Sequence, residues 1–159
     1  KSGFAASLPY IAASVGVLLG GVVSDGLIRR TGSATLGRKL PVIAGLLLTS
    51  TMVLANFTSS NAVVIAVMSV AFFGQGMGNL GWTLISDVAP KSMIGLTGGL
   101  FNLCANLAGI VTPIVIGVVV GRTGSFYGAL AYIGALGLLG AAAYAFILGP
   151  VVRVSVDED

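Results

Sequence analysis

Charged residues fall in short clusters separated by long uncharged stretches, and this pattern limits the fold more than any other feature of the sequence. No charged residue lies between Lys39 and Asp87, between Lys91 and Arg122, or between Arg122 and Arg153. A helix needs about 20 mostly apolar residues to cross a bilayer core. A charge at the centre of such a helix costs about 2.5 to 3.5 kcal/mol on insertion scales. Each gap is long enough for one or two membrane spans, so the clusters mark the loops.

The composition argues against a soluble domain and against several function classes. Hydrophobic residues make up 56% of the chain and charged residues only 8%, whereas soluble domains have about 25% charged residues. The net charge of +3 comes from basic loop residues and does not indicate a nucleic-acid partner. The chain has no histidine, and Cys104 is its single cysteine. We therefore expect neither an enzyme nor a metal site, and no cofactor.

Five apolar segments predict an all-α, polytopic transmembrane bundle. Backbone polar groups in hydrocarbon must pair internally, and long apolar runs without alternation are typical of helices rather than of a barrel. The chain (residues 1–159) is interpreted as one membrane domain followed by a tail over residues 149–159. The predicted spans are residues 4–28, 40–55, 62–84, 94–120 and 126–148.

The basic residues predict the orientation of these spans. The first and third loops and the tail together carry more Lys and Arg than the second and fourth loops. The positive-inside rule then places them in the cytoplasm, and five spans alternate correctly with a cytoplasmic C-terminus.

Glycine pairs four residues apart predict close helix packing. Small residues at this spacing let helix backbones approach where lipid supplies no hydrophobic drive. The pairs are Gly16 and Gly20, Gly74 and Gly78, and Gly117 and Gly121.

Two sets of amide side chains predict a polar face inside the membrane. Gln75, Asn79 and Thr83 follow at intervals of four residues, with Trp82 beside them. Such residues lie on one face of a continuous helix. An unpaired amide in hydrocarbon costs several kcal/mol, so this face must meet other helices or a water-filled cavity.

A second amide pair, Asn102 and Asn106, has the same spacing. Hydrogen bonding between helices would explain single amides, at about 0.6 kcal/mol per contact. Trp82 could alternatively belong to the aromatic belt of the membrane interface. Taken together, the two amide sets and the tryptophan favour a binding site for a polar solute.

The first loop contains a candidate conformational latch. Gly21 and Asp25 are followed by Arg29, and then by Arg38 within Gly-Arg-Lys. Gly21 would let a neighbouring helix come close, and Asp25 could accept hydrogen bonds from a helix N-terminus or from the arginines. The alternative is that these charges only fix the topology.

This loop resembles the G-x-x-x-D and G-R-K/R motif of the major facilitator superfamily, interrupted by an insertion-like stretch at residues 31–36. Further stretches look like its anion:cation symporter branch, of the D-galactonate and hexuronate type, and the match covers nearly the whole chain. They are FFGQG (72–76), WTLIS (82–86), AP (89–90) and IGLTGGLFN (94–102).

The resemblance implies that the chain is the last five of twelve helices of a transporter, whose N-terminal helix bundle lies outside this sequence. The chain begins without Met, and we expect it to be part of a longer protein. Asn79, Trp82 and Asn102 fall where the family binds substrate, although Asn79 and Gly81 replace expected hydroxyl residues. The arginine that binds the carboxylate and the acids that carry protons would lie in the missing half.

The function expected on this resemblance is proton-coupled symport of an organic anion such as D-galactonate in a bacterial inner membrane. The site residues would be Asn79, Trp82, Asn102, Gln75 and Asn106. One alternative keeps the fold but carries hexuronate, glucarate, tartrate or an aromatic acid. Another is a membrane subunit that transports nothing and binds partner helices with its polar faces.

Overall fold

The computed structural model describes residues 2–155, and all regular secondary structure in this range is helical. Five helical stretches are long and apolar enough to cross a membrane, which confirms the predicted all-α transmembrane bundle. Residue 1 and residues 156–159 of the predicted tail lie outside the described range. The helices are α1 (Ser2–Thr31), α2 (Ala34–Ser50), α3 (Asn61–Gly78), α4 (Gly81–Val88), α5 (Ile94–Thr123) and α6 (Tyr127–Ala142). Short 3-10 segments span Thr51–Phe57 and Lys91–Met93, and a π-helical turn spans Ala143–Ile147.

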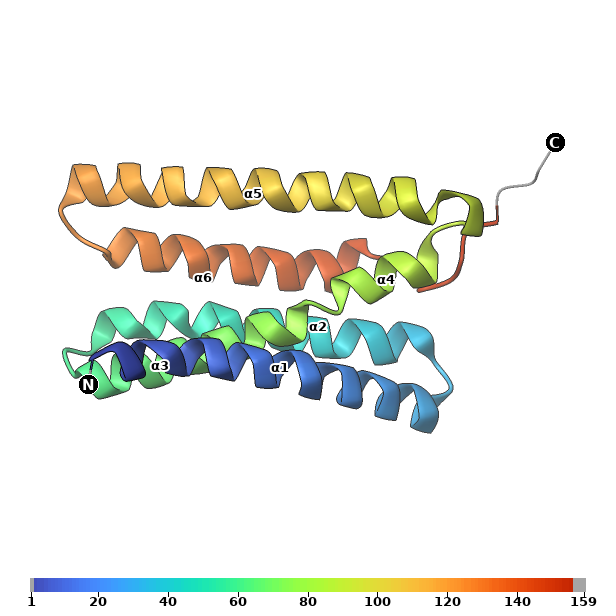
Figure 1. Cartoon of the computed structure of the whole chain (residues 1–159), viewed down its shortest axis with the longest axis horizontal. Coiled ribbons are helices and arrows are strands. Elements are labelled where there is room, and N and C mark those ends of the chain that lie inside the picture. The colour runs from blue at the N-terminus through green and yellow to red at the C-terminus, as the bar shows by residue number, and fades with distance from the viewer. Residues whose placement is uncertain (1, 156–159) are drawn as a thin grey trace.

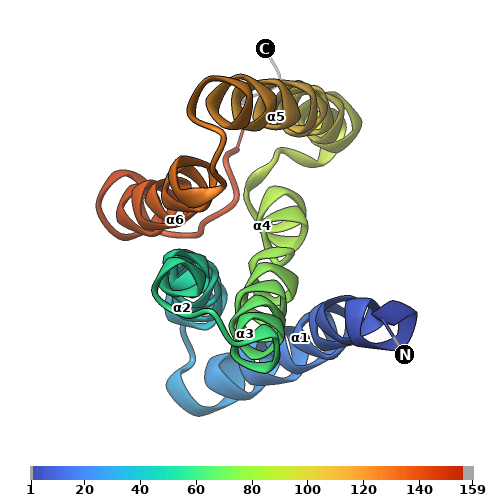
Figure 2. The same ribbon diagram turned by 90° about the vertical axis from the view of Figure 1, so that its left-hand side faces the viewer.

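The helices run side by side along the long axis of the molecule (Figure 1). Viewed along that axis, α3 lies between α1 and α2, and α6 lies next to α2 (Figure 2). The short helix α4 leads from α3 towards α5, which occupies the edge farthest from α1. No residue of α5 is buried among the described residues, so most of its surface is open in this chain.

Helix α2 begins six residues before the predicted span of 40–55. Ser33 caps it, because its side-chain oxygen accepts a hydrogen bond from the Leu36 backbone N–H at 3.3 Å. The insertion-like stretch therefore holds the end of α1, a two-residue turn and the first three residues of α2, and Arg38 and Lys39 lie within that helix. Both cations have partners there: Arg38 pairs with carboxylates, and Lys39 Nζ donates to the Leu148 carbonyl at 2.6 Å.

Two of the other predicted spans differ from the structure for local reasons. Helix α5 continues to Thr123 rather than residue 120, and Gly124 ends it with a left-handed φ of 64°. The predicted continuous span 62–84 is two helices, α3 and α4, with a break at Asn79 and Leu80. The predicted spans 4–28 and 126–148 agree with α1 and with α6 plus its π-helical turn to within three residues at each end.

Glycines make the contacts that hold α3 in place. A Cβ at Gly16 of α1 would contact the Phe73 carbonyl, and one at Gly76 would lie 2.9 Å from the Val17 nitrogen. Between α2 and α3, Gly45 and Gly74 face each other, and a Cβ at either would contact the carbonyl oxygen of the other. These helices therefore meet backbone to backbone, as glycine spacing predicts.

Not every predicted glycine pair makes such a contact within this chain. Gly20 meets Met77 of α3, with 3.1 Å between its Cβ position and the Met77 Cα. Gly78, Gly117 and Gly121 have no atom of another described helix within 4 Å of their Cβ positions. The last two lie on α5, whose surface is largely uncovered here.

Candidate functional site

The break between α3 and α4 interrupts the membrane-spanning stretch Asn61–Val88. Asn79 N donates to the Gly76 carbonyl at 3.2 Å, and Trp82 N donates to the Asn79 carbonyl at 3.2 Å. In both bonds the acceptor carbonyl lies three residues before the donor, whereas in an α-helix it lies four residues before. The chain is therefore wound more tightly here than in an α-helix. Irregular backbone at membrane depth is tolerated where it is buried in protein or lines a cavity. In secondary transporters, broken helices often mark the substrate site.

A cavity of about 610 Å³ lies beside this break, between α2, α3, α5 and α6. Gln75 and Asn79 both line it and both are exposed. The structure thus brings these two predicted site residues together. A cavity of this volume is in the range that holds small-molecule ligands.

Two threonines on the cavity wall were missed by the sequence analysis. Thr49 of α2 uses its hydroxyl to donate to the Gly45 carbonyl at 2.9 Å, while Thr112 of α5 is half-buried at the opposite wall. The available signal for Thr112 was its place directly before Pro113 in a long apolar run. Thr49 gave no such signal, because hydroxyl residues are common at helix ends.

Trp82 joins α4 to α5 through an aromatic contact. Its ring lies edge-on to Phe101, with centroids 4.8 Å apart and an interplanar angle of 80°. Trp82 remains 46% exposed, so part of its ring is available to a ligand. Because Phe101 directly precedes Asn102, this contact fixes the α5 turn that carries Asn102 beside α4.

Asn102 and Asn106 interact with each other along α5. The Asn106 Nδ2 donates to the Asn102 side-chain oxygen at 3.0 Å and to the Asn102 carbonyl at 2.8 Å. Both residues are exposed, and α5 contributes Ala108 and Thr112, not the asparagines, to the cavity beside Gln75. The structure therefore divides the predicted site into a cavity with Gln75 and Asn79, an aromatic contact at Trp82, and an exposed asparagine pair.

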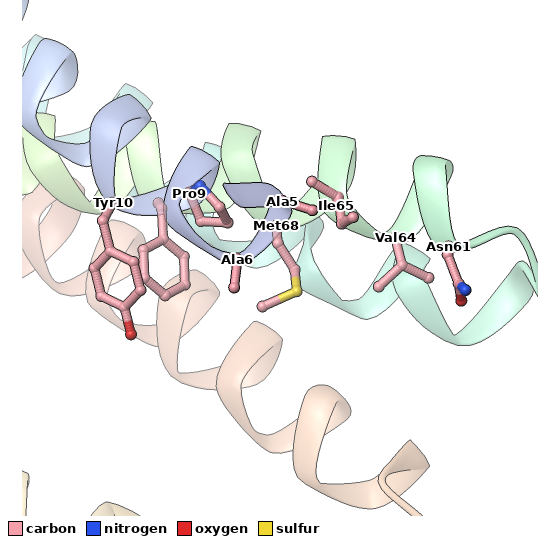
Figure 3. Close-up of a pocket in the computed structure, with 9 residues that line it drawn as sticks. Ala5, Ala6, Pro9, Tyr10, Asn61, Val64, Ile65 and Met68 are labelled. Carbon is pink, nitrogen blue, oxygen red and sulfur yellow. The ribbon is translucent and has the colours of Figure 1, made fainter. Parts of the chain in front are cut away.

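A second cavity of about 590 Å³ lies between the N-terminal halves of α1 and α3 (Figure 3). Tyr10 and Asn61 stand at opposite ends of a row of apolar lining residues. Tyr10 also packs edge-on against Phe72, with ring centroids 5.4 Å apart. This cavity offers widely separated polar groups and lacks the paired amides of the first one.

At the charged end of the bundle, Arg38, one of the residues of the predicted latch, contacts three side chains on two neighbouring helices. Its guanidinium donates to Asp25 at 3.1 Å, to Asp87 at 2.9 Å and to the Ser24 hydroxyl at 2.8 Å. The Arg38 side chain is only 15% exposed and Ser24 is fully buried. Arginine's planar fork suits such a multiple contact. Arg38 thereby ties α1, α2 and α4 together.

Asp87 is a partner of Arg38 that the sequence analysis missed. It lies 49 residues from Arg38, and its signal was that it ends a long uncharged stretch. Gly21 has no atom within 4 Å of its Cβ position, and exposed Arg29 makes no ion pair within residues 2–155. The predicted roles of Gly21 and Arg29 in the latch stay predictions.

The fold and the site define the class: this chain is a multi-pass α-helical membrane protein with a broken helix beside a mostly apolar cavity that Gln75 and Asn79 line. The sequence profile of the Major Facilitator Superfamily matches residues 1–158. The chain belongs to that superfamily.

The chain is similar in sequence to several named transporters. The probable galactarate/D-glucarate transporter GudP of Escherichia coli is 47% identical over 98% of this chain, and that of Bacillus subtilis is 48% identical over 97%. The D-galactonate transporter of Escherichia coli is 44% identical over 97% of the chain. The matches cover 35%, 34% and 36% of these relatives, so the chain spans about a third of their length.

Proposed function

We propose that this chain is the C-terminal part of a secondary active transporter for a sugar acid. The observation that carries the proposal is the α3–α4 break, where Asn79 and nearby Gln75 line a cavity and Trp82 follows directly. Amides can hydrogen-bond sugar hydroxyl groups, and a tryptophan ring can pack against a carbon skeleton. The names of the relatives support the same substrate class.

The proposed substrate is an aldaric or aldonic acid, with galactarate, D-glucarate and D-galactonate as the first candidates. The cavity beside Gln75 has no charged lining residue. We therefore propose that the rest of the protein supplies the cation for the substrate carboxylate and the groups that carry the coupling protons. A competition panel of hexuronates, tartrate and aromatic acids tests the alternative substrates.

We propose an inner-membrane location with the C-terminus in the cytoplasm. Most of the basic residues lie at one end of the helices, namely Arg29, Arg30, Arg38, Lys91 and Arg153. Arg122 lies at the other end. This asymmetry supports the orientation through the positive-inside rule. In that orientation the Arg38 latch would hold the cytoplasmic ends of α1, α2 and α4 together while the outer side is open.

Asn102→Ala in the full-length transporter tests the binding role of the exposed asparagine pair. A lost hydrogen bond contributes about 1 kcal/mol, so we expect a roughly 5-fold rise in the KM of sugar-acid uptake. Asn56→Ala is the control, because it also removes an asparagine that makes a hydrogen bond, here to the Tyr127 carbonyl. Asn56 lies in the 3-10 segment Thr51–Phe57, at the end of the bundle opposite to Arg38. Wild-type kinetics in Asn102→Ala, with normal insertion of the protein, would remove Asn102 from the site.

A further inference from the structure

The segment that follows α6 and its π-helical turn packs against the charged end of the helix bundle. The Leu148 carbonyl accepts a hydrogen bond from Lys39 Nζ at 2.6 Å, and Val151 N donates to Thr35 Oγ1 at 2.9 Å. Both partners belong to the first turns of α2, over 100 residues earlier in the sequence. The segment 148–155, called here the C-terminal clasp, is thus fixed to the start of α2.

The same segment then reaches the end of α4. Arg153 Nη2 donates to the Ser86 carbonyl at 2.9 Å, and Val154 N donates to the Val88 carbonyl at 2.9 Å. The last carbonyls of a helix have no partner within the helix, and a cation there is favourable. The clasp therefore supplies the end of α4 with donors that α4 itself lacks.

Val151 anchors the clasp in the protein interior. Val151 is 7% exposed and packs with Val42 of α2 and Leu84 of α4. Its neighbours Val152 and Val154 are 64% and 53% exposed. Leu148, at the start of the clasp, packs half-buried against the same cluster, so the clasp is held by two apolar side chains and by hydrogen bonds to α2 and α4.

Helix α4 is held at both of its ends. Its start is joined to α3 through the break at Asn79 and Leu80, and its end is held by the clasp and by the Asp87–Arg38 ion pair. We propose that the clasp is a releasable restraint, and that α4 pivots about the break only when the clasp detaches from α2. Its effect on uptake rests on the proposed transport function, whereas its effect on side-chain accessibility does not.

A reversible cross-link tests the release step in the full-length protein. Cysteines replace Thr35 and Val151 in a Cys104→Ser background, because the Val151 backbone N and the Thr35 Oγ1 lie 2.9 Å apart where the clasp meets α2. We expect oxidation to reduce sugar-acid uptake at least 10-fold and a reductant to restore it. Unchanged uptake in the cross-linked protein would overturn the proposal.

A second measurement is independent of transport. Leu84→Cys places a thiol beneath Val151, and its reaction rate with a hydrophilic maleimide reports opening of the clasp. Val151→Asp should raise that rate at least 10-fold, while the matched control Val152→Asp, at an exposed neighbour, should leave it unchanged. Equal rates in the two variants would overturn the proposal. If the protein with its disulfide reduced takes up no sugar acid, the proposed transport function fails. The maleimide labelling rates still test the clasp in that case.

Discussion

Arg38→Ala is expected to lower the free energy of unfolding of the full-length protein by about 2 to 3 kcal/mol and to reduce uptake strongly. Hydrogen bonds to charged groups contribute about 1.5 to 3 kcal/mol each, but they are not additive within one network. The bond to Asp25 contributes least, because that carboxylate is 60% exposed and screened by water. The loss at Asp87, which is 33% exposed, and at buried Ser24 dominates. Thermal unfolding in detergent and uptake in proteoliposomes measure the two effects.

Arg122→Ala is the matched control, because Arg122 is an exposed arginine in the last turn of α5 at the opposite end of the bundle. Its favourable position near the helix C-terminus contributes less than about 1 kcal/mol. Arg38→Lys should fall between the two, since one ammonium cannot reproduce the planar fork. Equal thermal stability in Arg38→Ala and Arg122→Ala would contradict the central role given to Arg38.

Gly45→Ala is expected to prevent close packing of α2 against α3. The new Cβ would contact the Gly74 carbonyl and lie 2.9 Å from the Met77 Cβ, and backbone atoms cannot rotate away as a side chain can. Overpacking typically costs about 1 to 3 kcal/mol, and we expect the upper end of that range. The measurement is the yield of monodisperse protein in detergent together with its melting temperature.

Gly140→Ala in α6 is the control with the same change of side chain. Its Cβ would meet only side-chain carbons of Leu46, at 3.3 to 3.4 Å, and these can shift. Alanine in a helix interior is otherwise favoured over glycine by up to about 1 kcal/mol, so this variant should be close to neutral. A Gly45→Ala protein as stable as Gly140→Ala would show that the two backbones do not meet at this crossing.

The sequence predicted the parts of the fold that depend on hydrophobicity, and missed those that depend on local caps. Charge spacing located the five spans, because lipid excludes unpaired charges. The same charge spacing predicted that the second span starts after Lys39, whereas α2 starts at Ala34 and is capped by Ser33. The i, i+4, i+8 spacing of Gln75, Asn79 and Thr83 indicated one continuous helix, although the glycines at 78 and 81 flank a break.

The parts of the site that depend on distant contacts could not be predicted from local patterns. Gln75 and Asn79 share a cavity as their spacing indicated, since four residues span about one helical turn. The pairing of Arg38 with Asp87 and the hydrogen bond from Val151 to Thr35 join residues 49 and 116 positions apart. Such contacts follow from how the helices pack, and no spacing rule along the chain encodes them.

The most direct test of sugar-acid transport is uptake of labelled galactarate, D-glucarate and D-galactonate by the full-length protein in proteoliposomes. Each is measured with and without an inward proton gradient, and empty liposomes give the background. We expect at least one of the three to accumulate, with faster uptake when the gradient is present. Folded protein that takes up none of them under either condition would contradict the proposed function.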